Sequence, residues 1–241
     1  MSESGRLPGL FVTGTDTGVG KTYVTAMIAV ALSNRGVRAG AYKPVCTGAT
    51  PKKAGGVQWE DVERLCAATG GQFDRRRICP QCFEAALAPP VAAEREKQSV
   101  DGQLLRDGAF WWTGRVDVLL VEGVGGLLCP LTATETVADL AKDLQLPLLI
   151  VARNGLGTIN HTLLTIEVAR HRGLAVAAVI LNDGPQRTGD ESTETNAREI
   201  SARIDVPLMR LRQDASQCEP LGTNGSEAFD WLQLIRRAMV R

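Results

Sequence analysis

The sequence lacks the features that mark membrane, secreted and nucleic-acid-binding proteins. None of its apolar runs approaches the roughly 20 residues that a membrane span needs. Residues 1–9 do not have the basic and then apolar pattern of a secretory signal. Lys plus Arg and Asp plus Glu each number 27, so the net charge of zero gives no electrostatic case for nucleic acid or an anionic membrane as main partner. We therefore expect a soluble cytoplasmic protein that has neither partner.

Cysteine is also sparse. The six cysteines are scattered along the 241 residues, which favours reduced thiols over a disulfide framework. Cys79 and Cys82 have the Cys-X-X-Cys spacing of metal and redox sites. Because neither a second such pair nor a nearby His accompanies them, a zinc site is weakly supported and incidental thiols are favoured.

Internal repeats, low-complexity tracts and an interdomain linker are absent too. A chain of this length fits one α/β domain or at most two small ones, and we expect a single domain over residues 1–241. Near-continuous apolar runs predict strands buried on both faces, at 10–13, 39–42, 116–121, 148–152, 175–181 and near 208–211. Helical patterns lie between them, at 22–35, 59–69, 102–112, 137–144, 158–172, 194–203 and 227–239.

This alternation predicts an α/β fold with a mainly parallel sheet, helices on both of its faces, and ligands at the carboxyl ends of its strands. Asp101 and Thr136 stand where helix N-caps belong, and Asp139 completes a capping-box pattern with Thr136. Glycines follow three of the predicted helices, as C-terminal glycines do: Gly36, Gly70 and Gly173. The least regular segments are candidates for active-site or lid loops: 47–58, 75–99 and 183–193.

The most informative segment is GTDTGVGKT at residues 14–22, which follows a predicted strand and opens a predicted helix. Glycines let backbone N–H groups close around phosphate oxygens, Lys21 neutralises phosphate charge, and the Thr22 hydroxyl is a magnesium ligand. Five residues lie between Gly14 and Gly20, where the usual phosphate loop has four. The longer spacing favours a particular branch of the phosphate-loop proteins.

Two charged residues stand at the ends of predicted strands. Lys43 follows the second strand and precedes Pro44, so it is suited to bind a phosphoryl group or an anionic substrate, unless it is a solvated surface lysine. Glu122 ends a strand and is followed by GVGG, in the manner of a Walker-B carboxylate that holds magnesium. Gly125 in that segment allows a ligand to approach the backbone closely. The alternative for Glu122 is a capping or loop residue.

Three further candidates are weaker. Asp61 begins a predicted helix and is either a metal ligand or a partner of the helix dipole, with Glu60 and Glu63 as competitors. Asn182 follows a predicted strand and is either a purine-binding amide or a turn residue. Residues 157–160 open a helix whose free N–H groups suit a carboxylate or phosphate, unless it is an ordinary helix start. His161 and His171 on that helix are interpreted as packing or surface residues.

Together these segments resemble the ATP-dependent dethiobiotin synthetase family, in family order from residue 10 to 183. The matching pieces are VTGTDTGVGKT at 12–22, GAYKPV at 40–45, VEGVGG at 121–126, PL at 130–131, LGTINHTLLT at 156–165 and ND at 182–183. The resemblance implies ATP-dependent ring closure of 7,8-diaminononanoate with CO2, through a carbamate and a carbamic–phosphoric anhydride. It also implies Mg²⁺ and a homodimer whose active site lies at the interface.

The resemblance assigns roles to the candidates. It implies that Lys21 and Lys43 stabilise the transferring phosphoryl group and the carbamate, and that Thr47 binds the carbamate or the diamine. The expected magnesium ligands are Thr22, Asp61 and Glu122. The expected nucleotide contacts are Thr17, Gly18, Val19, Gly20, Lys21, Thr22, Glu122, Gly125 and, at adenine, Asn182. The expected binding site for the substrate's distal carboxylate is the partner subunit's helix start at Gly157, Thr158, Ile159 and Asn160.

The sequence departs from the family at some positions. Gly18 stands where some members carry glutamate, and residues 79–93 keep only a loose likeness to the family's proline-rich substrate segment. Arg210 stands where the family often has a glycine beside the base, which leaves CTP and GTP open as competitors of ATP.

Rival functions fit the sequence less well. Partition-type ATPases carry a second lysine where this chain has Asp16. Cobyrinate-type amidating ligases need a glutamine-hydrolysing domain, for which we expect the roughly 60 residues after Asn182 to be too few. A diamine sensor without turnover would not need the magnesium carboxylates.

Overall fold

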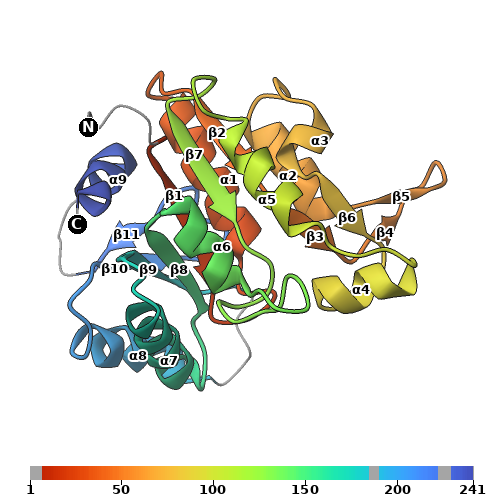
Figure 1. Cartoon of the computed structure of the whole chain (residues 1–241). Helices are drawn as coiled ribbons and strands as arrows, with labels where there is room; N and C mark the ends of the chain where they lie inside the picture. The colour runs from red at the N-terminus through yellow and green to blue at the C-terminus, as the bar shows by residue number, and fades with distance from the viewer. Residues whose placement is uncertain (1–6, 185–189, 222–228, 241) are drawn as a thin grey trace.

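The computed structural model describes residues 7–184, 190–221 and 229–240, and these form a central sheet in the order β11-β10-β9-β8-β1-β7-β2 (Figure 1). All of its pairings are parallel except that of β10 with β11. Its strands are β1 (Gly9–Gly14), β2 (Ala39–Tyr42), β7 (Val118–Glu122), β8 (Leu148–Arg153), β9 (Val176–Asn182), β10 (Leu208–Leu211) and β11 (Glu219–Pro220). The predicted α/β fold with a mainly parallel sheet is confirmed.

Helices cover both faces of the sheet, because side chains that alternate along each strand enter two separate cores. Leu10 and Val12 of β1 join one apolar cluster with the buried faces of α1 and α9. Phe11 joins a second cluster with α2 and α5 to α8. The helices around the sheet are α1 (Lys21–Ser33), α2 (Glu60–Ala68), α5 (Gly102–Phe110), α6 (Val137–Leu144), α7 (Thr158–His171), α8 (Ser192–Ser201) and α9 (Trp231–Met239). None of the helices in the described part of the chain has the length and apolar character to cross a membrane.

The helix ends follow the predicted signals. The Asp101 carboxylate accepts from the Leu104 backbone N–H at 3.0 Å, and Thr136 and Asp139 form a capping box. Gly36, Gly70 and Gly173 have φ of 75°, 68° and 72°, the left-handed conformation in which chains leave helices. The start of the helix predicted at 227–239 lies partly outside the described residues, and the described helix begins at Trp231.

The segments predicted to be irregular contain short elements, which corrects that expectation. Segment 75–99 holds α3 (Arg75–Ile78), β6 (Gln81–Phe83) and α4 (Pro89–Arg95), and 47–58 holds β4 (Thr50–Pro51) and β5 (Val57–Gln58). Strand β6 pairs in parallel with β3 (Val45–Thr47), beside the main sheet. Elements of two to seven residues are too short to show a periodic pattern, which is why the sequence did not reveal them. In segment 183–193, residues 185–189 lie outside the described residues.

Candidate active site at the strand ends

A glycine-rich loop joins β1 to α1 at the carboxyl edge of the sheet. Gly20 is the N-cap of α1 with φ of 103°, and a Cβ built there would lie 2.1 Å from the Asn182 amide nitrogen. The position therefore demands glycine for its conformation and for its space. The Lys21 ammonium donates to the Asp16 carbonyl at 2.9 Å, so the loop wraps around the lysine side chain. Backbone N–H groups at the start of α1 are suited to phosphate oxygens.

A lysine between two carboxylates lies beside this loop. The Lys43 ammonium is 2.6 Å from an oxygen of Asp61 and 2.6 Å from an oxygen of Glu122. The same Glu122 oxygen accepts from the Thr22 hydroxyl at 2.7 Å. Lys43 is 3% exposed and Glu122 is fully buried, while Asp61 is nearly half exposed. The ends of β2 and β7, which pair in the sheet, and the start of α2 bring these groups together.

The surroundings shift these groups in opposite directions. Burial lowers the pKa of Lys21 to about 8, although the Glu122 charge partly opposes the shift. Burial alone would also lower the pKa of Lys43, but the charges of Glu122 and Asp61 outweigh it and raise that pKa above its ordinary value. Burial would raise the pKa of Asp61, and the Lys43 ammonium reverses this and lowers it. Lys43 is therefore a cation in the folded protein. Burial destabilises the Lys21 ammonium, and a bound phosphate would stabilise it.

A cavity of about 790 Å³ opens over these groups. It brings together most of the residues that the sequence singled out: Thr17, Gly18, Gly20, Lys21, Thr22, Lys43, Thr47, Asp61, Glu122 and Gly125. Phosphate-loop, lysine and carboxylate candidates therefore share one site, which excludes the readings of Lys43 as a surface lysine and Glu122 as an exposed loop residue.

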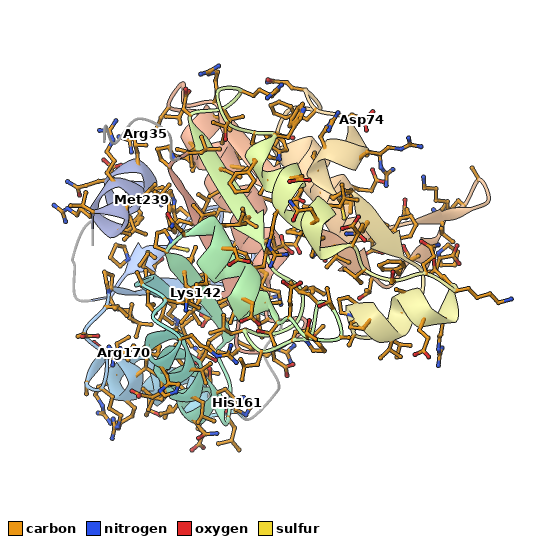
Figure 2. The ribbon with its side chains drawn as sticks, in the orientation of Figure 1. Arg35, Asp74, Lys142, His161, Arg170 and Met239 are labelled. Carbon is orange, nitrogen blue, oxygen red and sulfur yellow. The ribbon has the colours of Figure 1, made fainter. Side chains whose placement is uncertain are left out.

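The remaining predicted site residues lie elsewhere. Val19 is buried in the apolar cluster beneath the loop. Asn182 ends β9 and donates from its amide to the Val19 carbonyl at 2.9 Å, so it supports the phosphate loop directly. Residues 157–160 begin α7 and do not line the cavity. His161 and His171 on the same helix are exposed, as expected, and Figure 2 shows His161 at the outer edge of the molecule.

Sequence reasoning missed several residues of the cavity wall. Tyr23 and Arg64 form one side, with the Arg64 guanidinium 5.6 Å from the centre of the Tyr23 ring. Cys129 and segment 86–89, which leads into α4, form other parts of the wall. A signal was available only for Tyr23, which directly follows Thr22 on the first turn of α1. The others reach the cavity through tertiary structure.

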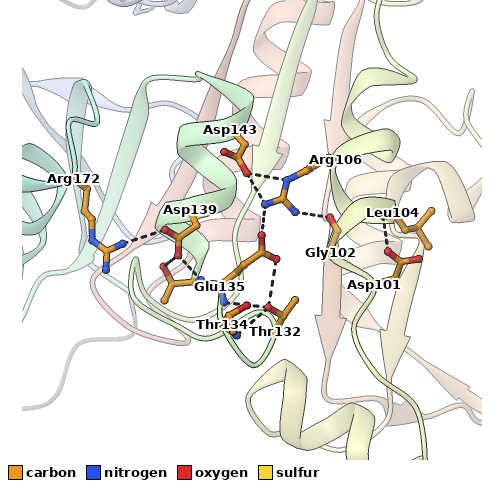
Figure 3. Close-up of polar contacts among 11 residues, drawn as sticks. Asp101, Gly102, Leu104, Arg106, Thr132, Thr134, Glu135, Asp139, Asp143 and Arg172 are labelled. Atoms are coloured by element: carbon orange, nitrogen blue, oxygen red, sulfur yellow. Dashed lines mark hydrogen bonds and ion pairs between the residues drawn. The ribbon is translucent and has the colours of Figure 1, made fainter.

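The chain between β7 and α6 contributes Val124, Gly125 and Cys129 to the cavity wall. Polar contacts of Arg106 anchor the end of this chain (Figure 3). Arg106 on α5 forms ion pairs with Glu135 at the end of this chain and with Asp143 on α6. It also donates to the Gly102 carbonyl at 2.7 Å. The Arg106 guanidinium thus fixes the positions of α5, of α6 and of the chain end at Glu135 relative to one another.

Arg210, the departure from the family pattern, is engaged within the protein. Its Nε atom lies 2.8 Å from a carboxylate oxygen of the buried Asp183. Asp183 also accepts from the Asn154 amide at 2.8 Å, and Asn196 donates to Asn154 at 2.9 Å. This polar network ties together the ends of β8, β9 and β10 next to Asn182.

The metal candidates are compatible with a magnesium ion. Among the described residues no cluster of three or more His, Cys, Asp or Glu side chains is arranged to hold a metal. Magnesium at nucleotide sites, however, takes one or two carboxylates and completes its shell with phosphate oxygens and water. Thr22, Asp61 and Glu122 supply such a set, and one buried oxygen of Glu122 has no hydrogen-bond partner.

Comparisons with known proteins show the family of this chain. A family model described as an AAA domain matches residues 8–210. The ATP-dependent dethiobiotin synthetase BioD of Anaeromyxobacter sp. (strain Fw109-5) is 46% identical, over 84% of this chain and 89% of that protein. The protein of the same name from Rhodopirellula baltica is 39% identical, over 90% of this chain and 90% of that protein. The one from Bacillus cereus (strain B4264) is also 39% identical, over 85% of this chain and 83% of that protein. The chain belongs to the ATP-dependent dethiobiotin synthetase family.

Proposed function

We propose that this chain, as a single domain, closes 7,8-diaminononanoate and CO2 into the cyclic urea of dethiobiotin at the expense of ATP, a step of biotin biosynthesis. Membership of the family supports the reaction. The observation that carries the assignment to this site is the convergence of Lys21, Lys43, Thr22, Asp61 and Glu122 on one cavity at the end of a phosphate loop.

The cations of the site suit the charges that this reaction develops. One amine of the substrate takes up CO2 and loses a proton, giving a carbamate. The carbamate oxygen attacks the γ-phosphorus and ADP leaves, which forms a carbamic–phosphoric anhydride. The second amine then attacks the carbamoyl carbon, loses a proton and expels phosphate. Lys43 is fixed as a cation by its two carboxylates, so we assign it to the carbamate and the transferring phosphoryl group, with Lys21 on the phosphates and Thr47 on the carbamate or the diamine.

We propose Thr22, Asp61 and Glu122 as the residues that hold Mg²⁺, supported by the unpartnered Glu122 oxygen. A bound magnesium ion would neutralise charge on the phosphates of ATP. In the same proposal the phosphates are bound by Thr17 and the backbone of residues 18–22, Gly125 allows close approach of the nucleotide, and Asn182, already next to the loop, contacts the base.

We propose a homodimer in which residues 157–160 of the partner subunit bind the distal carboxylate of the substrate. The support is that no side chain caps the start of α7 and that this helix start does not border the cavity of its own subunit. Leu156 beside it is 89% exposed, and Leu164 on α7 is 55% exposed, which suits a surface that meets a second copy.

The decisive experiment measures phosphate release from ATP with Mg²⁺ and bicarbonate, with and without 7,8-diaminononanoate, and identifies the organic product. Release that depends on the diamine and yields the cyclic urea supports the proposal. ATP hydrolysis that is indifferent to the diamine contradicts it and favours a switch-type ATPase.

A further inference from the structure

Two thiols that the proposed reaction does not use lie against each other near the site. The Sγ atoms of Cys79 and Cys82 are hydrogen-bonded at 3.4 Å. Cys79 directly follows α3 and is 5% exposed, while Cys82 lies in the middle of β6 and is half-buried. A disulfide joins sulfurs about 2.05 Å apart, so a shift of somewhat more than 1 Å would bring the two into bonding distance.

The two thiols are chemically unequal. The hydrogen bond with Cys79, aided by the charges of Arg75 and Lys43, lowers the pKa of Cys82 against the effect of its burial. Burial and the neighbouring Cys82 raise the pKa of Cys79. The thiolate is the attacking species in thiol–disulfide exchange. The more accessible Cys82 is therefore suited to react first and the buried Cys79 to react second.

We propose that Cys79 and Cys82 are a redox-active dithiol that low-molecular-weight disulfides convert into an intrachain disulfide. The Cys82 thiolate attacks one sulfur of the external disulfide, whose S–S bond breaks and releases one thiolate. Cys79 then gives up its proton to solvent and attacks the Cys82 sulfur, which releases the second thiolate. Two protein thiols are oxidised and one external disulfide is reduced to two thiols.

The pair is connected to the active site through the backbone. The carbonyl of Ile78, next to Cys79, accepts from the Lys43 N–H at 2.7 Å. The carbonyl of Phe83, next to Cys82, accepts from the Trp59 indole at 2.9 Å, immediately before the helix that carries Asp61. When the two sulfurs move together, the Ile78 and Phe83 carbonyls shift with them. Their hydrogen bonds position Lys43 and the helix that carries its partner Asp61. We expect a disulfide here to slow turnover several-fold.

The test of the thiol site uses the reduced full chain in buffers of increasing glutathione disulfide to glutathione ratio, followed by alkylation and peptide mapping. Wild type and the control Cys66→Ser should both form the Cys79–Cys82 disulfide and retain no glutathione on Cys82. Cys79→Ser should stop with one glutathione on Cys82, and Cys82→Ser should leave Cys79 reduced. Cys46 lies opposite Cys82 in the β3–β6 pairing, so mapping also distinguishes a Cys46–Cys82 bridge. Three results would overturn the proposal. They are a Cys46–Cys82 bridge, glutathione that persists on Cys82 of the wild type, and a Cys79–Cys82 pair that stays reduced when Cys66 has reacted.

The coupling to turnover has its own readout. Oxidised wild type should release phosphate several-fold more slowly than reduced wild type, dithiothreitol should restore the rate, and Cys79→Ser should show no such loss after removal of bound glutathione. An unchanged rate in the oxidised protein would overturn the coupling. The rate measurement rests on the proposed function, whereas the peptide mapping does not. Failure of the proposed function is therefore distinguishable from failure of the dithiol proposal.

Discussion

The cavity at the ends of β1, β2 and β7 and the start of α7 are both expected to bind substrate, yet they differ in how complete they are within one chain. In the cavity, Lys43 and Glu122 are buried and paired with each other, and Glu122 also accepts from the Thr22 hydroxyl of another element. At α7, Gly157 and Asn160 are exposed, and Leu156 presents most of its side chain to the surface.

The difference fits what each region is proposed to bind. Transferring a phosphoryl group requires charges fixed in advance, and buried ion pairs fix them because a lone buried charge is costly. Binding a carboxylate at a helix start requires only N–H groups that already point outward. The cavity is therefore preorganised inside the chain, whereas the start of α7, in the proposed homodimer, binds substrate only together with the cavity of the partner subunit.

The largest effect should come from removing the phosphate-loop charge. Lys21→Met keeps the length of the buried side chain and deletes the ammonium, so we expect diamine-dependent phosphate release to fall about a hundredfold or more. Thermal stability should not fall at neutral pH, because the buried ammonium opposes folding when no phosphate is bound. If Lys21→Met released phosphate near the wild-type rate, the Lys21 charge would not be needed, and the cavity would not differ from an ordinary surface in this respect.

The next effect tests the carboxylate that joins Lys43 to Thr22. Glu122→Gln keeps the shape and weakens both the ion pair and the proposed magnesium ligand, so turnover should fall about tenfold or more and need more Mg²⁺. Asp117→Asn is the matched control just before the same strand, where the carboxylate pairs with Arg38 in solvent and should contribute little to stability. A magnesium titration that is identical for wild type and Glu122→Gln would remove Glu122 from the metal site.

These two residues also mark how far sequence reasoning reached. The strands and the phosphate loop were predictable because each is local: an apolar run, a glycine turn, a lysine at a helix start. Lys43 and Glu122 were identified as chemical residues at strand ends, but the sequence did not predict their contact, since it depends on β2 pairing with β7. The ion pair of Arg210 with Asp183 was likewise hidden, because it joins two strands 27 positions apart.

What failed was the reading of segment 75–99 as a loop. Strand β6 is three residues long and pairs with β3 outside the main sheet, so neither length nor alternation distinguishes it from irregular chain. Its position becomes evident only from partners such as Trp59, whose indole donates to the Phe83 carbonyl. The segment was correctly expected to lie near the site, since residues 86–89 line the cavity.

A smaller effect should separate the two regions directly. Leu156→Arg places a charge on the exposed start of α7, and in the proposed homodimer it should shift sedimentation toward monomer and raise the KM for the diamine several-fold, with ATP binding unchanged. Val240→Arg is the control, because Val240 is equally exposed at 89% but lies beyond α9. Wild-type sedimentation and KM for Leu156→Arg would leave the start of α7 an ordinary surface.

The smallest effect is a pH dependence confined to the cavity. The pKa of Lys21 is about 8 in the empty protein, against 10.5 for an unperturbed lysine, so the ammonium is progressively lost above pH 8. Phosphates bind the charged form, and ATP affinity should therefore weaken as pH rises from 8 to 10, by at most about tenfold per pH unit. Stability changes in the opposite direction: between pH 8 and 10.5 the unfolded chain binds the proton and the folded chain does not, so this group makes the empty protein more stable as pH rises. Calorimetric ATP titrations and thermal unfolding across this range check both signs, and Lys21→Met should lose both dependences. The amides at the start of α7 do not titrate in this range, so Leu156→Arg should keep the wild-type pH dependence of ATP affinity and of thermal unfolding. If Leu156→Arg altered this pH dependence and Lys21→Met did not, the cavity would not be the origin of the effect.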